Sequence, residues 1–140
     1  MKVIVMPRLK RYRIFFSHAW DFDEHAKIEA FLRTTSNFIF TDLSVPHDNP
    51  VEARGKKDLS TKLTNLIRLS QVVLISAGME VNYRPWIDFE LNVAQDMNKP
   101  IVGIVPLGQT RIPAKVEDAA CDIVRWRRKS IADSVRYYAI

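Results

Sequence analysis

Short apolar runs alternate with amphipathic helical patterns along most of the chain, and this alternation limits the fold more than any other feature of the sequence. Continuous apolar runs are typical of strands that are buried on both faces, as in parallel sheets covered by helices. Between two such runs, Leu59, Leu63 and Leu66 recur at the spacing of one helix face. Strands are predicted at residues 11–16, 38–41, 72–75, 101–105 and 122–126.

The pattern predicts a doubly wound α/β sheet. We expect about five parallel strands in the flavodoxin-like order 2-1-3-4-5, with helices on both faces because parallel crossovers are right-handed. A chain of 140 residues suits a single domain over residues 1–140. Residues 1–10 precede the first strong strand and are expected to form an N-terminal arm or an edge strand.

Polar residues and a proline mark where three of the helices should begin. Asp21 and Glu24 have the spacing of a capping box at the start of the first helix. Pro85 is well placed as the first residue of a helix that ends near Met97, because proline is favoured at that position. Ser130 is predicted to cap the last helix.

The composition excludes several kinds of site. Cys121 is the only cysteine, which rules out an internal disulfide and a cysteine zinc site; we expect it in the core. His18, His25 and His47 lack metal-ligand spacing, so no metal is predicted and His25 is interpreted as structural. No apolar run is long enough for a signal peptide or a membrane span, which predicts a cytoplasmic protein without a membrane partner. The net charge of +5 favours anionic partners such as nucleotides.

A ligand cleft is expected at the carboxyl ends of the strands. In open α/β sheets the crevice lies where the strand order reverses, here between the first and third strands. The segments that follow the first three strands should meet there, beside the helix that starts at Pro85. The predicted substrate-binding residues are Phe16, Ser17, His18, Trp20, Asp42, Ser44, Met79 and Trp86.

Glu90 breaks the pattern of that helix. At about 100° per residue it falls inside the apolar face. Burying a charge without partners is costly, so a carboxylate there suggests a functional site. A structural bond to a backbone amide or to Arg84 is the other interpretation. With Pro85 at the first position Glu90 would lie in the second turn, where the helix dipole helps little. The apolar face is predicted to consist of Trp86, Val93, Ala94 and Met97.

Several motifs together make the sequence similar to a known family. In order and spacing they resemble TIR and TIR-like domains, and most of all the TIR-like subunit of bacterial Thoeris antiphage defence. The resemblance covers about residues 11–138. The motifs lie at residues 14–20 (IFFSHAW), 44–48 (SVPHD), 73–79 (VLISAGM), 86–91 (WIDFEL), 99–104 (KPIVGI) and 111–113 (RIP).

The resemblance implies an enzyme that cleaves the nicotinamide–ribose bond of NAD, with NAD as substrate and no cofactor. Thoeris-type members convert NAD to a cyclic ADP-ribose-like signal that activates a separate antiviral effector. The family's catalytic glutamate follows a tryptophan by four positions and matches Glu90, four residues after Trp86. The implied partners are NAD, an effector reached through the nucleotide signal, a second copy of the chain and a phage protein as trigger.

The chemistry gives this match a reason. Loss of nicotinamide leaves an oxocarbenium-like ribose, which a nearby carboxylate stabilises, as in glycoside cleavage. Nicotinamide leaves as a neutral group, so no general acid is needed and one carboxylate suffices. The exclusion of water then decides between ring closure by the adenine and hydrolysis.

Other interpretations stay open for the individual residues. His18 could be simply hydrogen-bonded, Trp20 could cover the sheet edge instead of stacking on a base, and Trp86 could pack in the core. The positive charges of Arg54, Lys56 and Lys57 could hold phosphates, although a solvated helix start explains them equally well.

Three other functions compete with the enzyme. In a non-enzymatic self-association module, Glu90 would be structural. A nucleic-acid binder is suggested by the basic cluster at residues 125–129, but an exposed strand end explains that cluster better, and nucleic acid is not an expected partner. A response-regulator receiver is rejected, because it needs acidic residues where Ser17, His18 and Ser76 stand.

Overall fold

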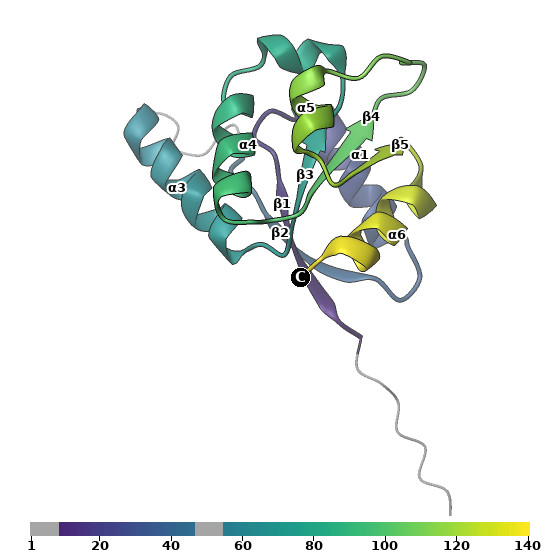
Figure 1. The fold of residues 1–140 in the computed structure, drawn as a ribbon. Helices are drawn as coiled ribbons and strands as arrows, with labels where there is room; N and C mark the ends of the chain where they lie inside the picture. Colours follow the sequence, from purple (N-terminus) through teal and green to yellow (C-terminus); the bar gives the residue numbers. More distant parts are fainter. Residues whose placement is uncertain (1–8, 47–54) are drawn as a thin grey trace, which may run out of the picture.

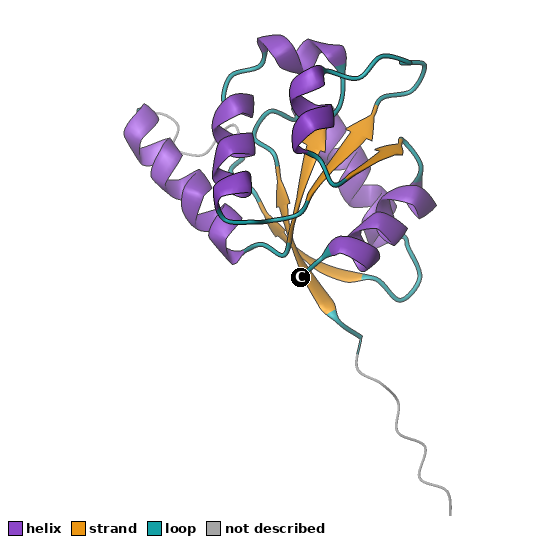
Figure 2. Cartoon of the chain, viewed as in Figure 1, coloured by secondary structure: helices purple, strands orange, loops and turns teal. Residues whose placement is uncertain are grey.

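The computed structural model describes residues 9–46 and 55–140, which form one sheet of five parallel strands in the order β2-β1-β3-β4-β5 (Figures 1 and 2). This is the predicted flavodoxin-like order. Each strand pairs in parallel with its neighbour; Ile14 of β1, for example, lies opposite Asp42 of β2 and Val72 of β3. The strands are β1 (Arg11–Phe16), β2 (Ile39–Leu43), β3 (Val72–Ser76), β4 (Ile101–Val105) and β5 (Asp122–Arg125).

Helices cover both faces of the sheet, as expected (Figure 1). In Figure 1, α3, α4 and α5 lie on one face, and α1 and α6 lie on the other. A short 3-10 helix, η1, connects β3 to α4. The helices are α1 (Phe22–Arg33), α3 (Lys56–Leu69), η1 (Met79–Tyr83), α4 (Ile87–Asp96), α5 (Ala114–Ala119) and α6 (Arg128–Tyr138).

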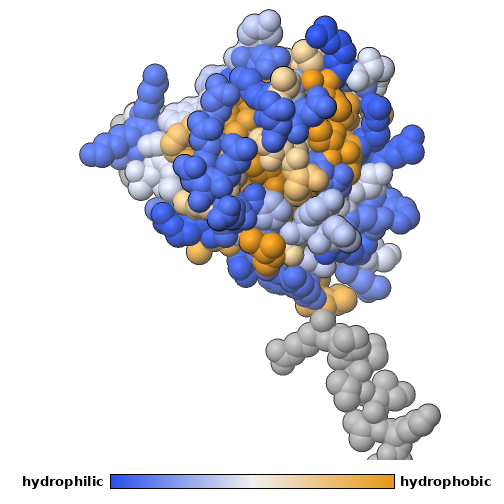
Figure 3. Space-filling view, viewed as in Figure 1, coloured by the Kyte–Doolittle hydropathy of each residue, from blue (hydrophilic) through white to orange (hydrophobic). Residues whose placement is uncertain are grey.

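Two apolar clusters hold these layers together. Phe15 and Val73 pack with α3 and α4 in one cluster, whereas their neighbours Phe16 and Leu74 pack with α1 and α6 in the other. Successive strand residues point to opposite faces, so burial on both faces explains the continuous apolar runs. The surface seen in Figure 3 is mostly hydrophilic over the helices, with apolar patches between them.

The predicted start of the helix after β3 is wrong. The sequence placed the helix start at Pro85, but η1 lies before it and α4 begins at Ile87. Trp86 adopts the left-handed conformation, with φ of 73°, and turns the chain from η1 into α4. Such a conformation is uncommon for a bulky residue, so the pattern gave no reason to expect it. As a result, Glu90 lies in the first turn of α4, not in the second.

Of the two predicted helix caps, one is confirmed and one is wrong, and the prediction for Cys121 is also wrong. The capping box of Asp21 and Glu24 is confirmed, since each side chain accepts a hydrogen bond from the other's backbone N–H. The predicted cap at Ser130 is wrong, because α6 already begins at Arg128 and Ser130 lies inside it. Cys121 is exposed and not part of the core, because it precedes β5 at the edge of the sheet.

β2 begins and ends later than predicted. It extends to Leu43, so Asp42 belongs to the strand and does not follow it. Within the predicted arm, residues 9 and 10 precede β1 without joining a strand, and the rest of that prediction lies outside the described residues, as do His47 and Arg54. Among residues 9–46 and 55–140, no helix has both the length and the apolar character needed to cross a membrane.

Candidate active site

Glu90 is completely buried on the inner face of α4. Its exposed fraction is 0%, and it lies among Ile87, Leu91 and Ala94, the other buried residues of the helix. The prediction that Glu90 lies on the buried face is therefore confirmed. The centre of that face differs from the predicted one, because Trp86 precedes the helix, and Val93 and Met97 are only half-buried.

The carboxylate of Glu90 is held by the loop that follows β1. The Ser17 hydroxyl donates to Oε1 at 2.5 Å, and the backbone N–H of His18 donates to Oε2 at 2.8 Å. The backbone N–H of Ala19 donates in turn to the Ser17 oxygen at 3.0 Å. The contact with a backbone amide was one of the structural alternatives. The contact with Arg84 is not formed, because that side chain pairs with two other carboxylates.

Burial raises the pKa of Glu90 to about 7, and the hydrogen bonds from Ser17, His18 and Ala19 keep it from rising further. Its place in the first turn of α4 also favours the ionised form, because the helix dipole is positive there. A carboxyl that changes its charge near neutral pH is typical of catalytic sites, although structural networks produce such groups as well.

A cavity of about 460 Å³ opens beside this loop. Ser17 and His18 form one part of its wall, and residues from α1 and the end of β2 form the rest. Its size falls within the range of small-molecule sites. Among the described residues, the cavity is lined by Ser17, His18, Trp20, Phe22, His25, Ala26, Glu29, Asp42, Ser44, Val45 and Pro46.

A second cavity, of about 350 Å³, lies on the other side of the same loop. His18 and Trp20 line both cavities, and Arg84 and Trp86 line only the second. Glu90 lines neither, because Ser17, His18 and Ala19 lie between its carboxylate and the open space. The acid therefore points inward at the predicted switch point, one residue layer behind the cavity wall.

His18 and Trp20 are both buried, and a ring nitrogen of each lies within hydrogen-bonding distance of a backbone carbonyl oxygen. The imidazole Nδ1 of His18 lies 3.0 Å from the carbonyl oxygen of Val45. The indole N–H of Trp20 donates to the carbonyl of Leu74 at 3.0 Å, and only 1% of the side chain is exposed. So little free ring surface favours packing over base stacking for Trp20.

Of the other predicted substrate-binding residues, three line one of the two cavities and two line neither. Asp42 and Ser44 line the first cavity, as expected of a shared site. Trp86 is half-buried, lines the second cavity and packs edge-on against Phe89. Phe16 is fully buried and does not line the first cavity. Its ring stacks on that of His25, which does line the cavity, with 4.7 Å between the ring centroids. Met79 begins η1 and lines neither cavity.

Three cavity residues form a polar group that the sequence analysis missed. His25 Nε2 lies 2.9 Å from Asp42 Oδ2, and Glu29 follows His25 by one helical turn. Burial and the adjacent Asp42 carboxylate raise the pKa of Glu29. Burial alone would raise the pKa of Asp42, but hydrogen bonds from His25, Ser44 and Glu29 hold it below its usual value. The i, i+4 spacing of His25 and Glu29 was the available signal.

The same three residues could hold a metal ion by geometry. One ligand atom from each lies within 4.8 Å of the others, a unique arrangement among the described residues. Asp42 Oδ1 is buried and has no hydrogen-bond partner when both acids are ionised. A metal ion could bind this oxygen, but a proton on Glu29 could satisfy it equally well. The prediction that no metal binds stays a prediction.

The basic cluster near β5 does not form a flat surface of exposed charges and rings. Trp126 turns inward and packs edge-on against Trp20 and Phe31. Arg125 is exposed and donates to the carbonyl of Gln109. This arrangement fits the interpretation of an exposed strand end.

Comparisons with known proteins agree with the fold and point to a family. The family model of the Thoeris protein ThsB, TIR-like domain, matches residues 14–111. Among solved structures that match, the Clostridium botulinum CMP N-glycosidase BcmB superposes with a TM-score of 0.53 at 14% identity, over 89% of this chain and 98% of that one. At that identity the likeness shows the fold alone. No curated protein sequence matches the chain.

Proposed function

This chain belongs to the family of the TIR-like domain of the Thoeris protein ThsB, and we propose on that premise that it cleaves an N-glycosidic bond of a nucleotide, the nicotinamide–ribose bond of NAD. The observation that carries the proposal is Glu90. It is a buried carboxyl with a pKa of about 7, held at the end of β1 directly behind a cavity of nucleotide size. The structural neighbour that is named as a CMP N-glycosidase supports glycosidic cleavage by a protein of this fold.

The proposed reaction needs one negative charge. The bond between ribose C1′ and the nicotinamide nitrogen breaks, and both electrons go to the nitrogen, which loses its positive charge. The ribose becomes an oxocarbenium ion, and the Glu90 carboxylate stabilises it. Water or a nitrogen of the adenine then bonds to C1′, the attacking water or adenine loses one proton to the solvent, and hydrolysis or cyclisation is complete.

The substrate must reach Glu90 through the wall of the cavity. The Ser17 hydroxyl occupies Oε1, and Ser17 also lines the larger cavity. A ribose hydroxyl can donate to the same oxygen once the Ser17 side chain rotates away. A hydrogen bond to a charged group contributes about 1.5–3 kcal/mol, so the exchange of one hydroxyl for another is nearly balanced.

The finer parts of the proposal follow from the family and from the cavity. We propose a cyclic ADP-ribose-type product that activates an antiviral effector in the cytoplasm. The apolar part of the cavity wall, with Trp20, Val45 and Pro46, would exclude water and so favour ring closure over hydrolysis. A phage protein as trigger and a second copy of the chain remain the proposed partners.

The test is to incubate the full chain with NAD and measure nicotinamide by chromatography. Wild type should release nicotinamide, and Glu90→Gln should release at least about 1,000-fold less, because an amide cannot stabilise the cation by charge. Circular dichroism and thermal unfolding establish that the variant is folded. CMP, assayed in parallel, tests the nucleotide preference. Equal release of nicotinamide by wild type and a folded Glu90→Gln would refute the proposal.

A non-enzymatic self-association module is the second candidate, and one observation favours it. Glu90 is sealed from both cavities with its oxygens hydrogen-bonded, as a structural carboxyl would be. In addition, Tyr83 and Phe22 expose 90% and 80% of their surfaces, and rings of this kind often contact partners. Concentration-dependent assembly by light scattering, with no nicotinamide release from the assembled protein, would select this function.

A further inference from the structure

Arg84 connects the loop after β1 to the segment that leads into α4. Its Nη1 donates to the carbonyl oxygen of Ala19 at 2.6 Å and to Glu24 Oε1 at 2.6 Å. Its Nη2 donates to Glu80 Oε1 at 3.1 Å. The planar guanidinium thus joins one backbone carbonyl and two carboxylates, a geometry for which its fork of donors is suited.

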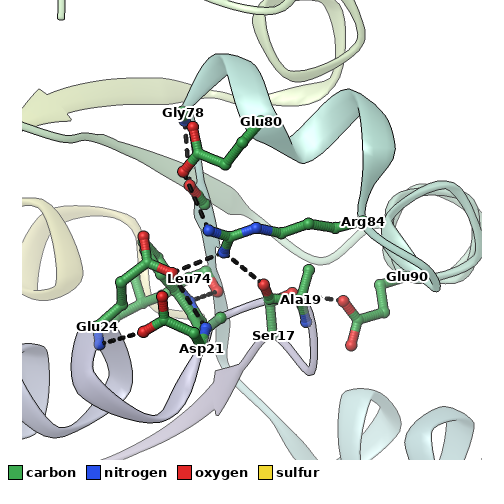
Figure 4. A network of polar contacts seen from close by, with 11 residues as sticks. Ser17, Ala19, Asp21, Glu24, Leu74, Gly78, Glu80, Arg84 and Glu90 are labelled. Atoms are coloured by element: carbon green, nitrogen blue, oxygen red, sulfur yellow. Dashed lines mark hydrogen bonds and ion pairs between the residues drawn. The ribbon is translucent and has the colours of Figure 1, made fainter.

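Arg84 and Glu90 hold the same short loop from two sides (Figure 4). Arg84 binds the carbonyl of Ala19, whereas Glu90 accepts from the Ser17 hydroxyl and the His18 backbone N–H. The Ala19 N–H, from the same residue that Arg84 binds, donates to the Ser17 oxygen. Every hydrogen bond that steadies the ionised form of Glu90 therefore starts in the segment that Arg84 ties down.

One carboxylate partner of Arg84 is itself held in place. Glu24 also accepts from the backbone N–H of Asp21 at 3.0 Å, within the capping box of α1. Glu80, by contrast, leaves 46% of its side chain exposed, so the Ala19 carbonyl and Glu24 are the firmer anchors of the guanidinium. The side chain of Arg84 is mostly buried, with 20% exposed, so the guanidinium has little freedom to move.

We propose that Arg84 is a positioning residue for the reaction of Glu90: by tying the Ala19 carbonyl to Glu24 and Glu80, it holds the Ser17–His18 donors against the Glu90 carboxylate. The inference rests on the function proposed above. It assigns no contact with the reacting atoms to Arg84, which acts through the loop.

The surroundings of Glu90 make this effect measurable through pH. The groups that face its carboxylate are Ser17, His18 and Ala19 of the β1–α1 loop. The charged groups nearby are paired elsewhere: Arg84 with Glu24 and Glu80, and Lys115 of α5 with Asp88 on the outer side of α4. A loosened loop withdraws donors from the ionised form only, and the pKa of Glu90 then rises.

The experiment compares the full-length variants Arg84→Gln and Arg84→Lys with wild type in NAD cleavage from pH 5.5 to 9. Lys115→Gln is the matched control, because it removes a cation beside α4 without a contact to the loop. We expect Arg84→Gln to move the acid limb of the kcat profile up by about one pH unit, which lowers kcat about fivefold at pH 7 and about tenfold below about pH 6. Arg84→Lys keeps a charged donor for the Ala19 carbonyl and should recover most of that loss, and Lys115→Gln should match wild type.

A second readout does not depend on turnover. The ¹³C shift of the Glu90 carboxyl, followed through the same pH range, should show the same upward shift in Arg84→Gln. This separates the two hypotheses: no nicotinamide release by wild type, with the ¹³C shift present, refutes the proposed function and leaves the positioning role intact. An unchanged acid limb with a raised KM would make Arg84 a substrate contact and overturn the inference. An equal loss of kcat at every pH in both Arg84 variants, with an unchanged Glu90 titration, would overturn it as well.

Discussion

Two glutamates near the cavity have raised pKa values, for different reasons. Burial is the main cause for both Glu90 and Glu29. Glu90 faces neutral donors, whereas Glu29 lies beside the carboxylate of Asp42 and pairs with Arg33 at 2.9 Å. A raised pKa alone therefore does not identify a catalytic acid; the neighbours of the carboxyl decide what it can do.

The difference concerns the charge that remains for a substrate. Among the described residues, Glu90 has no cationic partner, so its negative charge is available to a developing cation. The charge of Glu29 is countered by Arg33 and faces the carboxylate of Asp42, so it is less available to a substrate. Each prediction below tests this contrast.

Shortening each side chain by one methylene should give the largest difference in kcat between the Glu90 and Glu29 variants. Glu90→Asp withdraws the carboxylate from the reacting carbon and should lower kcat for nicotinamide release about 100-fold, because a misplacement of 1 Å can cost that much. Glu29→Asp should change KM a few-fold and leave kcat nearly unaffected. Steady-state kinetics at pH 8 measure both, and similar losses of kcat in the two variants would end the contrast.

The stability of the protein should report the burial of Glu90. Its pKa rises from an ordinary 4.5 to about 7 on folding, so the folded state binds the proton more tightly. The stability from this group is fully present below pH 4.5 and is lost as the pH rises through about 7. Wild type should lose about 2 kcal/mol relative to Glu90→Gln between pH 5 and pH 8. Urea unfolding at the two pH values is the measurement, and a constant difference would contradict the burial effect.

The Ser17 hydroxyl should have a smaller effect. Ser17→Ala removes the donor to Oε1 and raises the pKa of Glu90 further, which lowers activity about tenfold at pH 7 and less at higher pH. Ser44→Ala removes another hydroxyl of the cavity wall that does not contact Glu90, and it should leave the pH dependence of activity unchanged. A tenfold loss that is equal at pH 7 and pH 9 would show that Ser17 does not act through ionisation.

The smallest effect is expected at His25. His25→Gln removes the main hydrogen bond that lowers the pKa of Asp42. A depressed pKa stabilises the fold above the ordinary value of 3.8 and loses that effect as the pH falls through the folded value. The pair is partly exposed, so the loss should be under about 1 kcal/mol. Thermal unfolding at pH 7 and pH 3 would show it, with the smaller difference at pH 3.

The sequence predicts the sheet well because the strands are continuous apolar runs buried on both faces. β4 and β1 begin and end where predicted, and Glu90 stands out because a charge inside a helical apolar face is rare. The β3–α4 connection could not be predicted, because a bulky Trp86 in the left-handed region is held there by tertiary packing and not by its own preference.

The residues that form the site were harder to predict than its position in the fold. Arg84 was considered only as a partner of Glu90, since no local pattern indicates that it reaches Glu24, which lies sixty residues earlier. Phe16 was placed near the ligand because it ends β1, but its side chain is fully buried and lines neither cavity, whereas Trp20 lines both. Contacts between segments distant in sequence are set by the tertiary structure, and periodicity carries no information about them.

The two cavities on either side of the His18–Trp20 wall have a practical consequence for chemical probes. Since both residues line both spaces, a fragment in each would lie against the same short segment. Joining two weakly bound fragments with a linker of matching length places the second at an effective concentration in the millimolar range, and the joined compound can exceed either fragment in affinity by about 10²–10⁴. Such a compound would be specific to proteins that share this divided architecture.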